Sequence, residues 1–291
     1  MNKSNFKVDF IGIGEGKSAT SWIFKCIKEH PQICGAIPKE THFFDRHYED
    51  GIERYKKFFS HCKERKIKGE YTPGYLRHQE TAKRIKQHFP QAKLICCLRD
   101  PLGILISRYY FRYSRGKSDS ILDLNSYLKE INLERVKYFK NLTRFLKLFP
   151  RKQIIVLLYE DIEKNPQKFI QEIYKFLEVD SSIVPESALK KANETVTNKV
   201  RFRFLNKSLW RIRKFIRRKR HSKQIIKIMR VLGLNFLAKK AFALNRRKGN
   251  FKTVKKAKPS EKIAREIKAE LKEDIINLEK LINRDLSSWY E

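Results

Sequence analysis

The chain has 291 residues, of which 41% are hydrophobic and 12% aromatic, and this composition excludes a wholly disordered protein and favours one main globular domain. Its 66 lysines and arginines outnumber 32 acidic residues and give a formal net charge of +34, which attracts polyanions, phosphorylated ligands or anionic lipid headgroups. Residues 199–258 contain 23 of the basic residues and no acidic one, so most of the excess charge belongs to one segment.

The five cysteines are odd in number and form a poor disulfide framework for a chain of this size. We therefore predict that they are reduced thiols with structural roles. The first residues pass into a strand-like stretch without an apolar run of signal-peptide length, and no stretch approaches the roughly 18 apolar residues of a membrane span. The expectation is a cytoplasmic protein without signal peptide or transmembrane helix, with peripheral membrane contact left open.

The predicted elements alternate between strands and helices. The strands expected span residues 7–14, 93–98 and 153–159. The helices expected span residues 20–30, 81–88, 122–149 with a possible break, and 166–177. Near-continuous apolar strands between helices predict an α/β fold with a central parallel β-sheet flanked by helices on both faces.

Shifts in composition suggest three consecutive parts of the chain. Residues 1–198 form the predicted α/β core, and residues 199–258 form a basic, mainly helical segment. Residues 259–291 begin with a proline and a serine and continue as a charged amphipathic helix to about residue 283. We expect this last helix to pack back on the core.

The segment between the first strand and the first helix, residues 12–21 (GIGEGKSATS), has the composition of a phosphate-binding loop. Backbone N–H groups at a helix N-terminus favour an anion there. One alternative is a tight connection that Thr20 or Ser21 caps. Another is the P-loop of a kinase or NTPase, because the letters GxxxxGKS are present; Ser18 would then bind magnesium and Asp161 would be the second acidic partner.

The letters after the lysine favour a third interpretation. Residues 14–22 (GEGKSATSW), after a Phe-Ile-Gly strand, resemble the 5′-phosphosulfate loop of sulfotransferases that use 3′-phosphoadenosine 5′-phosphosulfate (PAPS). The family commonly has glycine where this chain has Ala19. The resemblance implies a P-loop NTPase-like sulfotransferase fold. The donor-binding residues that it implies here are Gly14, Gly16, Lys17, Ser18, Ala19, Thr20, Ser21 and Trp22.

A second motif, residues 98–101 (LRDP) followed by Ser107, ends a predicted strand and enters a helix. It resembles the 3′-phosphate site of the same family, where an arginine and a serine hold one phosphate through charge-assisted hydrogen bonds. Here these residues are Arg99 and Ser107. The open alternative is that Arg99 pairs with Asp100 or caps the turn. The family often has a further arginine where this chain has Ile104.

Residues 38–44 (PKETHFF) resemble the Lys-Glu-x-His-Phe-Phe element of carbohydrate sulfotransferases, in which the glutamate is the general base. The resemblance implies Glu40 as the base and Lys39 as an acceptor contact. A carboxylate can serve as a base if a partly buried site raises its pKa toward neutrality, a shift that the sequence does not reveal. His42 is the rival base because histidine titrates nearest pH 7. On an extended segment the two side chains would face the same side. Lys17 is expected to stabilise charge on the leaving phosphate oxygen, and no metal is implied.

Residues 69–75 (GEYTPGY) resemble a family loop that borders the acceptor and the nucleotide. The resemblance implies acceptor contacts from Glu70, Thr72 and Tyr75, and the alternative is a turn with a packed tyrosine. Glycosaminoglycan enzymes often have lysine where this chain has Tyr71, so their acceptor does not carry over.

Further matches extend the resemblance over most of residues 7–290. They include the YED letters at residues 159–161 with the helix that follows, and the ending DLSSW at residues 285–289. The candidate for the family's basic glycine loop over the nucleotide is Arg247-Lys248-Gly249.

The sequence thus favours an enzyme that moves a sulfuryl group from PAPS to a hydroxyl or amine of a carbohydrate or glycolipid. A P-loop kinase using magnesium and ATP ranks second. A non-catalytic polyanion- or nucleic-acid-binding protein ranks third, because no recognisable nucleic-acid module accompanies the charge. Residues 202–220 are expected to form a basic amphipathic helix that packs on the core or lies on an anionic membrane. The oligomeric state is not predicted.

Overall fold

The computed structural model describes residues 6–62, 67–113, 123–189 and 257–291. The chain divides into two compact units. The first comprises residues 1–104, 132–194 and 264–291, and the second comprises residues 105–131 and 195–263. Nearly all of the basic segment, including the amphipathic helix expected over residues 202–220, lies outside the described residues, so the predicted three-part division of the chain stays a prediction.

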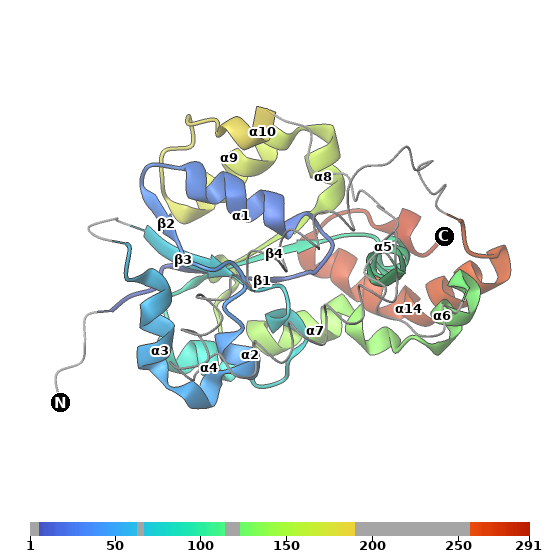
Figure 1. Ribbon diagram of the computed structural model, residues 1–291. Coiled ribbons are helices and arrows are strands. Elements are labelled where there is room, and N and C mark those ends of the chain that lie inside the picture. The colour runs from blue at the N-terminus through green and yellow to red at the C-terminus, as the bar shows by residue number, and fades with distance from the viewer. Residues whose placement is uncertain (1–5, 63–66, 114–122, 190–256) are drawn as a thin grey trace, which may run out of the picture. The chain divides into compact units, whose positions relative to one another are not determined.

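A five-stranded parallel sheet forms the centre of the first unit (Figure 1). Its strands are β1 (Phe10–Gly14), β2 (Ile33–Gly35), β3 (Ile67–Tyr71), β4 (Lys93–Leu98) and β5 (Ile154–Leu158). Their spatial order is β2-β3-β1-β4-β5, and every neighbouring pair is parallel. Gly12 pairs with Tyr71 on one side and with Ile95 on the other. The predicted α/β fold with a central parallel sheet is confirmed.

Helices cover both faces of this sheet (Figure 1). Those within the first unit are α1 (Thr20–Glu29), α2 (Phe43–Arg46), α3 (Ile52–Lys56), α4 (Thr81–His88), α7 (Tyr138–Leu146), α8 (Tyr159–Lys164), α9 (Pro166–Leu177) and α10 (Glu186–Leu189). The remaining described helices are α5 (Pro101–Tyr113), α6 (Leu124–Glu130) and α14 (Glu261–Ile282). Single 3-10 turns span Tyr48–Asp50, Lys57–Phe59, Tyr75–Arg77, Leu133–Arg135, Arg151–Gln153 and Ser287–Trp289.

The sequence located elements with an apolar run or helical spacing and missed strands that have neither. The predicted helices at residues 81–88 and 166–177 match α4 and α9, and the expected break in residues 122–149 separates α6 from α7. Strands β2 and β3 were not predicted. The first has only three residues, and the second, IKGEY, contains two charged residues in five, so neither shows an apolar run.

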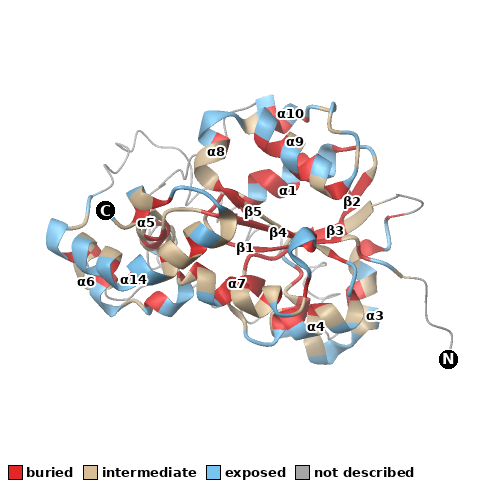
Figure 2. Ribbon diagram, turned by 180° about the vertical axis from the view of Figure 1, so that it is seen from behind, coloured by how far each residue is buried: buried red, intermediate tan, exposed pale blue. Residues whose placement is uncertain are grey.

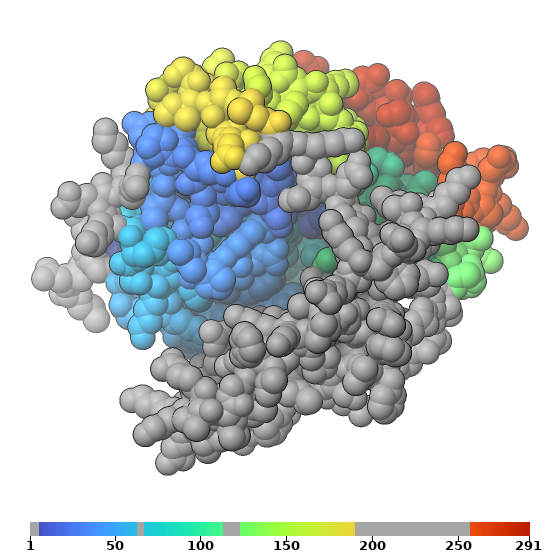
Figure 3. All heavy atoms as spheres, turned by 45° about the horizontal axis from the view of Figure 1, so that its top comes forward, coloured from blue at the N-terminus to red at the C-terminus, as the bar shows by residue number. Residues whose placement is uncertain are grey.

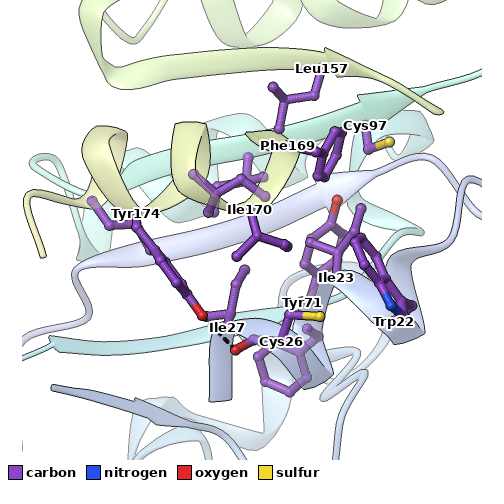
Figure 4. Close-up of a cluster of buried hydrophobic side chains, with 14 of the residues drawn as sticks. Trp22, Ile23, Cys26, Ile27, Tyr71, Cys97, Leu157, Phe169, Ile170 and Tyr174 are labelled. Carbon is purple, nitrogen blue, oxygen red and sulfur yellow. Dashed lines mark hydrogen bonds between the residues drawn. The ribbon is translucent and has the colours of Figure 1, made fainter. Parts of the chain in front are cut away.

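The main core lies between the sheet and the helices α1 and α9 (Figure 4). Trp22, Ile23, Cys26 and Ile27 of α1 face the sheet, because this spacing places them on one side of a helix. The Tyr174 hydroxyl of α9 donates a hydrogen bond of 2.8 Å to the Cys26 carbonyl. The strands are buried along most of their length, whereas the outer helix faces are exposed (Figure 2). On the face in Figure 3, α1 and α10 lie side by side.

The prediction of five reduced cysteines is wrong for two of them. Cys34 in β2 and Cys62 after α3 form a disulfide, with Cα atoms 5.7 Å apart. Cys26, Cys96 and Cys97 are free and buried. The pairing could not be foreseen because it depends on β2, an edge strand that has no sequence signal.

None of the described helices is long and apolar enough to cross a membrane.

Candidate active site

The segments that resemble donor-binding motifs meet at the carboxyl edge of the sheet. The loop of residues 15–19 follows β1, and Arg99 follows the neighbouring strand β4. The Arg99 Nη1 group donates a hydrogen bond of 3.5 Å to the Lys17 carbonyl, across 82 positions of sequence. The chain passes from β1 to strands on one side and then to β4 on the other, so the strand order reverses here. Open α/β sheets bind ligands at such a switch point.

No side chain caps the N-terminus of α1, which follows the loop of residues 15–19. Ala19 is the N-cap residue, with φ 54° and ψ 18° in the left-handed region, and no side chain caps the helix. No acidic residue lies in the first turn. The alternative in which Thr20 or Ser21 caps the connection is therefore wrong. The glycine common in the family at this position suits the same left-handed backbone.

Ser18 provides an independent test of whether a phosphate group fits this loop. Its hydroxyl is fully buried and has no hydrogen-bond partner among the described residues. A buried hydroxyl without a partner costs about 1–3 kcal/mol. The Gly16 N–H is already engaged by the Glu15 carboxylate at 2.6 Å, and the Lys17 backbone has φ 85°. A phosphate oxygen beside Ser18 would accept a hydrogen bond from its hydroxyl, at a helix N-terminus that favours an anion.

Two residues of the P-loop alternative, Gly12 and Asp161, have other roles in this structure. Gly12, the first glycine of the Walker pattern, lies inside strand β1, where a Cβ atom would stand 2.2 Å from the Tyr71 ring. The absence of a side chain at Gly12 therefore serves packing against Tyr71. Asp161, the candidate acidic partner, forms a two-pronged ion pair with Arg284 at 2.9 and 3.1 Å. Both features have structural roles that a nucleotide-bound metal does not explain.

Arg99 is held from one side by an aromatic ring. Its guanidinium lies 4.1 Å from the centre of the Tyr159 ring. The alternative pairing with Asp100 is not what the structure shows, because that carboxylate accepts hydrogen bonds from the N–H groups of Leu102 and Gly103 at the start of α5. Ile104, where the family often has arginine, is fully buried.

Two parts of the predicted donor site are not tested by this arrangement. Ser107 belongs to the second unit. The segment Arg247-Lys248-Gly249 lies outside the described residues. The roles of both stay predictions.

The predicted base and its rival meet in the turn after β2. His42 Nδ1 lies 3.1 and 3.2 Å from the two Asp45 carboxylate oxygens, and its Nε2 lies 3.7 Å from Glu40 Oε2. Lys39 Nζ contacts the other Glu40 oxygen at 2.9 Å. Glu40 and His42 face each other as expected, but through left-handed backbone with φ 62° and 52°, not through an extended segment.

The two groups carry opposite charges at neutral pH. The pKa of Glu40 is lowered to about 2, first by the hydrogen bond to His42 and then, against a smaller effect of burial, by Lys39. The pKa of His42 is raised to about 9, first by its hydrogen bond to Asp45 and then by Glu40. Burial acts to raise the Glu40 pKa, but the net shift is away from neutrality, because 44% of the side chain is exposed and two cations flank it.

The buried carboxylate of Glu70 supports the turn that carries Glu40 and His42. Glu70 at the end of β3 is fully buried, and burial raises its pKa. It accepts hydrogen bonds from four hydroxyl groups, those of Thr72 at 2.6 Å, Tyr75 at 2.7 Å, Thr41 at 2.9 Å and Tyr55 at 3.3 Å. The Tyr75 oxygen also accepts the N–H groups of Phe43 and Phe44. The network therefore fixes the backbone on both sides of His42.

A family model for the sulfotransferase domain matches residues 7–231, most of the chain. The chain belongs to the sulfotransferase domain family. This membership agrees with the two phosphate-binding motifs at the switch point of the sheet.

Individual relatives resemble parts of this sulfotransferase. The membrane-associated sulfotransferase kil1 of Dictyostelium discoideum is 39% identical over 106 residues, 35% of this chain and 22% of that protein. Mouse heparan sulfate glucosamine 3-O-sulfotransferase 3A1 is 29% identical over 178 residues, 57% of this chain and 44% of that protein. The chain thus spans less than half the length of these two relatives. A sulfotransferase structure from Alicyclobacillus acidocaldarius shares the fold, with a TM-score of 0.68 and 19% identity over 98% of this chain and all of that one.

Several residues that the sequence placed at the ligands also have structural partners. Trp22 lies in the core, and its indole N–H donates to the Ser187 carbonyl at 2.8 Å. Glu70, Thr72 and Tyr75 are fully buried, and the hydroxyl groups of Thr72 and Tyr75 donate to Glu70, so the three residues support the Glu40 turn. The ligand contacts predicted for these four residues stay predictions.

Several hydrogen-bond partners of these residues were not predicted from the sequence. Asp45, three residues after His42, was not singled out, although that spacing places both on one face of a helical turn. Nothing in the sequence marks Thr41 and Tyr55 as part of this site. Their role follows from hydrogen bonds to Glu70, which is distant in sequence. Tyr71 donates to the Gly14 carbonyl at 2.7 Å and thereby braces the donor loop.

Relief of the backbone at the donor loop should stabilise the protein. We expect Ala19→Gly to raise the free energy of unfolding by about 0.5–1 kcal/mol, because glycine adopts φ 54° without the steric penalty that alanine incurs. Ala269→Gly, at an exposed position inside α14, is the matched control and should lower stability by about 1 kcal/mol. Urea unfolding of both variants measures the effect, and a loss of stability in Ala19→Gly would contradict this account.

The Glu70 network should contribute to the stability of the protein. Glu70→Gln keeps the shape but replaces one carboxylate oxygen by an NH₂ group, so at least one hydroxyl loses its acceptor. We expect a loss of about 1–3 kcal/mol. The exposed Glu53→Gln on α3 should be neutral. Thermal unfolding of the two variants measures the difference. Equal melting temperatures would show that the network does not contribute this stability.

Proposed function

We propose that this sulfotransferase transfers a sulfuryl group from PAPS to a hydroxyl or amine of a carbohydrate or glycolipid acceptor. The observation that carries the proposal is the meeting of two anion-binding motifs, through Arg99 and the Lys17 carbonyl, at one sheet edge. PAPS has anionic groups at both its 3′ and 5′ ends, whereas ATP has none at its 3′ carbon. The kinase alternative is not favoured, because Asp161 is engaged by Arg284.

The chain's own groups would hold the donor as follows. The first turn of α1 and the Ser18 hydroxyl would bind the 5′ end, and Arg99 would bind the 3′-phosphate. The role of Ser107 rests on the sequence motif alone. When bound, PAPS supplies the sulfuryl group. The Lys17 ammonium would stabilise the negative charge that develops on the phosphate oxygen as the sulfuryl group departs. The proposal needs no metal ion, since Lys17 supplies this positive charge.

Glu40 is the proposed base because it is ionised and accessible. Protonated His42 would hold the carboxylate in place, and Asp45, which touches His42 and not Glu40, is a positioning residue. A carboxylate with a pKa of about 2 is a weak base in water. An acceptor that covers Glu40 would exclude water and raise its pKa, because desolvation disfavours the charged form. The hydroxyl proton would then pass to Glu40 as the sulfuryl group arrives.

The acceptor class rests on resemblance and on charge. The mouse relative is named for heparan sulfate glucosamine, a carbohydrate, and the net charge of +34 favours an anionic partner. Glycosaminoglycan enzymes often have lysine where this chain has the buried Tyr71. The proposal therefore does not specify which position of the carbohydrate is sulfated. Peripheral contact with an anionic membrane through residues 199–258 and a cytoplasmic location belong to the same proposal. The word membrane-associated in one relative's name supports the former.

The donor assignment predicts a phosphate-specific loss of affinity. In Arg99→Ala, 3′-phosphoadenosine 5′-phosphate should bind about 10–100-fold more weakly, while 5′-AMP binding changes little, because only the former has a 3′-phosphate. The exposed Lys83→Ala on α4 is the control and should bind both normally. Calorimetry with both ligands, and with ATP and magnesium, measures this. Equal losses for both nucleotides, or tighter binding of ATP, would overturn the assignment.

The base assignment predicts opposite pH profiles for the two candidates. If Glu40 is the base and protonated His42 holds it, kcat/KM stays level through neutral pH and falls as His42 loses its proton near pH 9. If neutral His42 were the base, the rate would instead rise toward pH 9. Glu40→Gln should lower kcat about 100-fold or more without weakening donor binding.

Asp45→Asn provides the companion test. Removal of this carboxylate takes away the first cause of the raised His42 pKa, so the alkaline fall in kcat/KM should move to lower pH. Glu53→Gln should leave the profile unchanged. Transfer of labelled sulfate from PAPS to a glucosamine-containing oligosaccharide provides the rate, and an unshifted profile in Asp45→Asn would remove Asp45 from the mechanism.

A further inference from the structure

Two cysteines and a histidine gather at the β2 edge of the sheet. Cys34 lies in β2, and His61 and Cys62 follow the 3-10 turn after α3. His61 Nε2 stands 3.5 Å from Cys34 Sγ and 3.6 Å from Cys62 Sγ. The three side chains can place one ligand atom each within 4.8 Å of one another. The sulfurs are buried, whereas the imidazole is exposed to solvent.

These nitrogen-to-sulfur distances match those around a tetrahedral metal ion. With zinc bonds of about 2.3 Å to sulfur and about 2.05 Å to nitrogen, a tetrahedral angle separates the two ligand atoms by about 3.6 Å. The structure has this separation on both sides of His61. Only the two sulfurs would have to move, to about 3.8 Å apart in the same geometry. Rotation of the two side chains provides this movement without displacing Cα atoms that are 5.7 Å apart.

We propose that, when the Cys34–Cys62 disulfide is reduced, these two thiolates and His61 bind one divalent cation of the zinc class. Two thiolates and an imidazole are the ligands that such a cation prefers, and their charge neutralises it. The protein provides three ligands, so the exposed fourth position takes water. His61 Nε2, now 3.2 Å from the Gly35 carbonyl, would give up that contact and offer its lone pair, with the proton on Nδ1.

The two states differ by a balanced exchange. A small dithiol gives two electrons and two protons to the disulfide, which becomes two thiols while the dithiol becomes a cyclic disulfide. The cation then displaces one proton from each thiol and forms two metal–sulfur bonds. In an oxidising environment the disulfide prevails, and in a reducing environment the metal-bound form is available.

The position of this site gives either cross-link the same structural effect. Cys34 lies six residues before Glu40. The chain between them is tied to neighbouring segments by the Ala36 N–H, which bonds to the Gly69 carbonyl, and the Ile37 N–H, which bonds to the Phe58 carbonyl. A disulfide or a metal ion would each fasten β2 to the 3-10 turn beside that connection. The metal therefore replaces the disulfide as the clamp on the strand that leads to the Glu40 turn.

The test uses the full chain without a histidine tag, reduced by a dithiol that is then removed without air. Co²⁺ is added as the probe, because thiolate ligands give it an intense charge-transfer absorption in the near ultraviolet. We expect saturation at one equivalent for the reduced chain and no such band for the oxidised chain. Zn²⁺ should then displace Co²⁺ and abolish the band.

Variants show which residues are responsible. Cys34→Ser and Cys62→Ser should abolish the band, and His61→Ala should bind Co²⁺ at least about tenfold more weakly. His47→Ala, which removes another exposed histidine, should bind normally. A folded reduced chain without the band, or an unchanged band in Cys62→Ser, would overturn the proposal. If reduction unfolds the chain by circular dichroism, failure of Zn²⁺ to restore the fold overturns it as well. None of these readouts depends on sulfuryl transfer.

Discussion

The Glu70 carboxylate is the group on which the turn of Glu40 and His42 depends. A fully buried carboxylate is tolerated only when hydrogen-bond donors surround it, and four hydroxyl groups from three segments of the chain supply them. Two of these, Thr41 and Tyr75, also accept backbone N–H groups of the turn that carries His42. Loss of the carboxylate would therefore leave several buried polar groups unpaired at once. The left-handed backbone at Glu40 and His42 persists because this network holds the chain between and after them.

The donor side is organised by the sheet itself. Parallel strands direct their carboxyl ends to one edge, and the reversal of strand order beside β1 opens that edge to a ligand. Gly12 lies flush under the Tyr71 ring, and the Tyr71 hydroxyl bonds to the Gly14 carbonyl. One side chain of β3 thus fixes the strand from which the loop of residues 15–19 departs. The donor loop and the Glu40 turn share β3 as their support, since Glu70 and Tyr71 are neighbours on it and point to opposite faces.

The sequence predicts features that depend on neighbouring residues better than contacts between segments far apart in the chain. The strand–loop–helix at residues 10–29 and the helices α4 and α9 follow from local apolar spacing, so they were found. The Cys34–Cys62 bond, the Arg99 contact with Lys17 and the Glu70 network join segments far apart in sequence, and local patterns do not encode those distances. Resemblance supplied the pairing of the two phosphate motifs. It could not show that Trp22 and Tyr75 are buried, because a packed side chain and a ligand-binding side chain can be the same residue type.

Glu40 and Glu70 show how one fold gives two carboxylates opposite properties. Glu70 is surrounded by protein, and burial raises its pKa despite four hydroxyl donors. Glu40 lies 44% exposed between His42 and Lys39, and these cations lower its pKa. Carboxylates with diverging pKa values in one site have different tasks. The buried group, closed to solvent, can only hold the turn. The exposed group is ionised and can exchange a proton with a substrate, and any acceptor that displaces the water around it also moves its pKa toward the range where a base is effective.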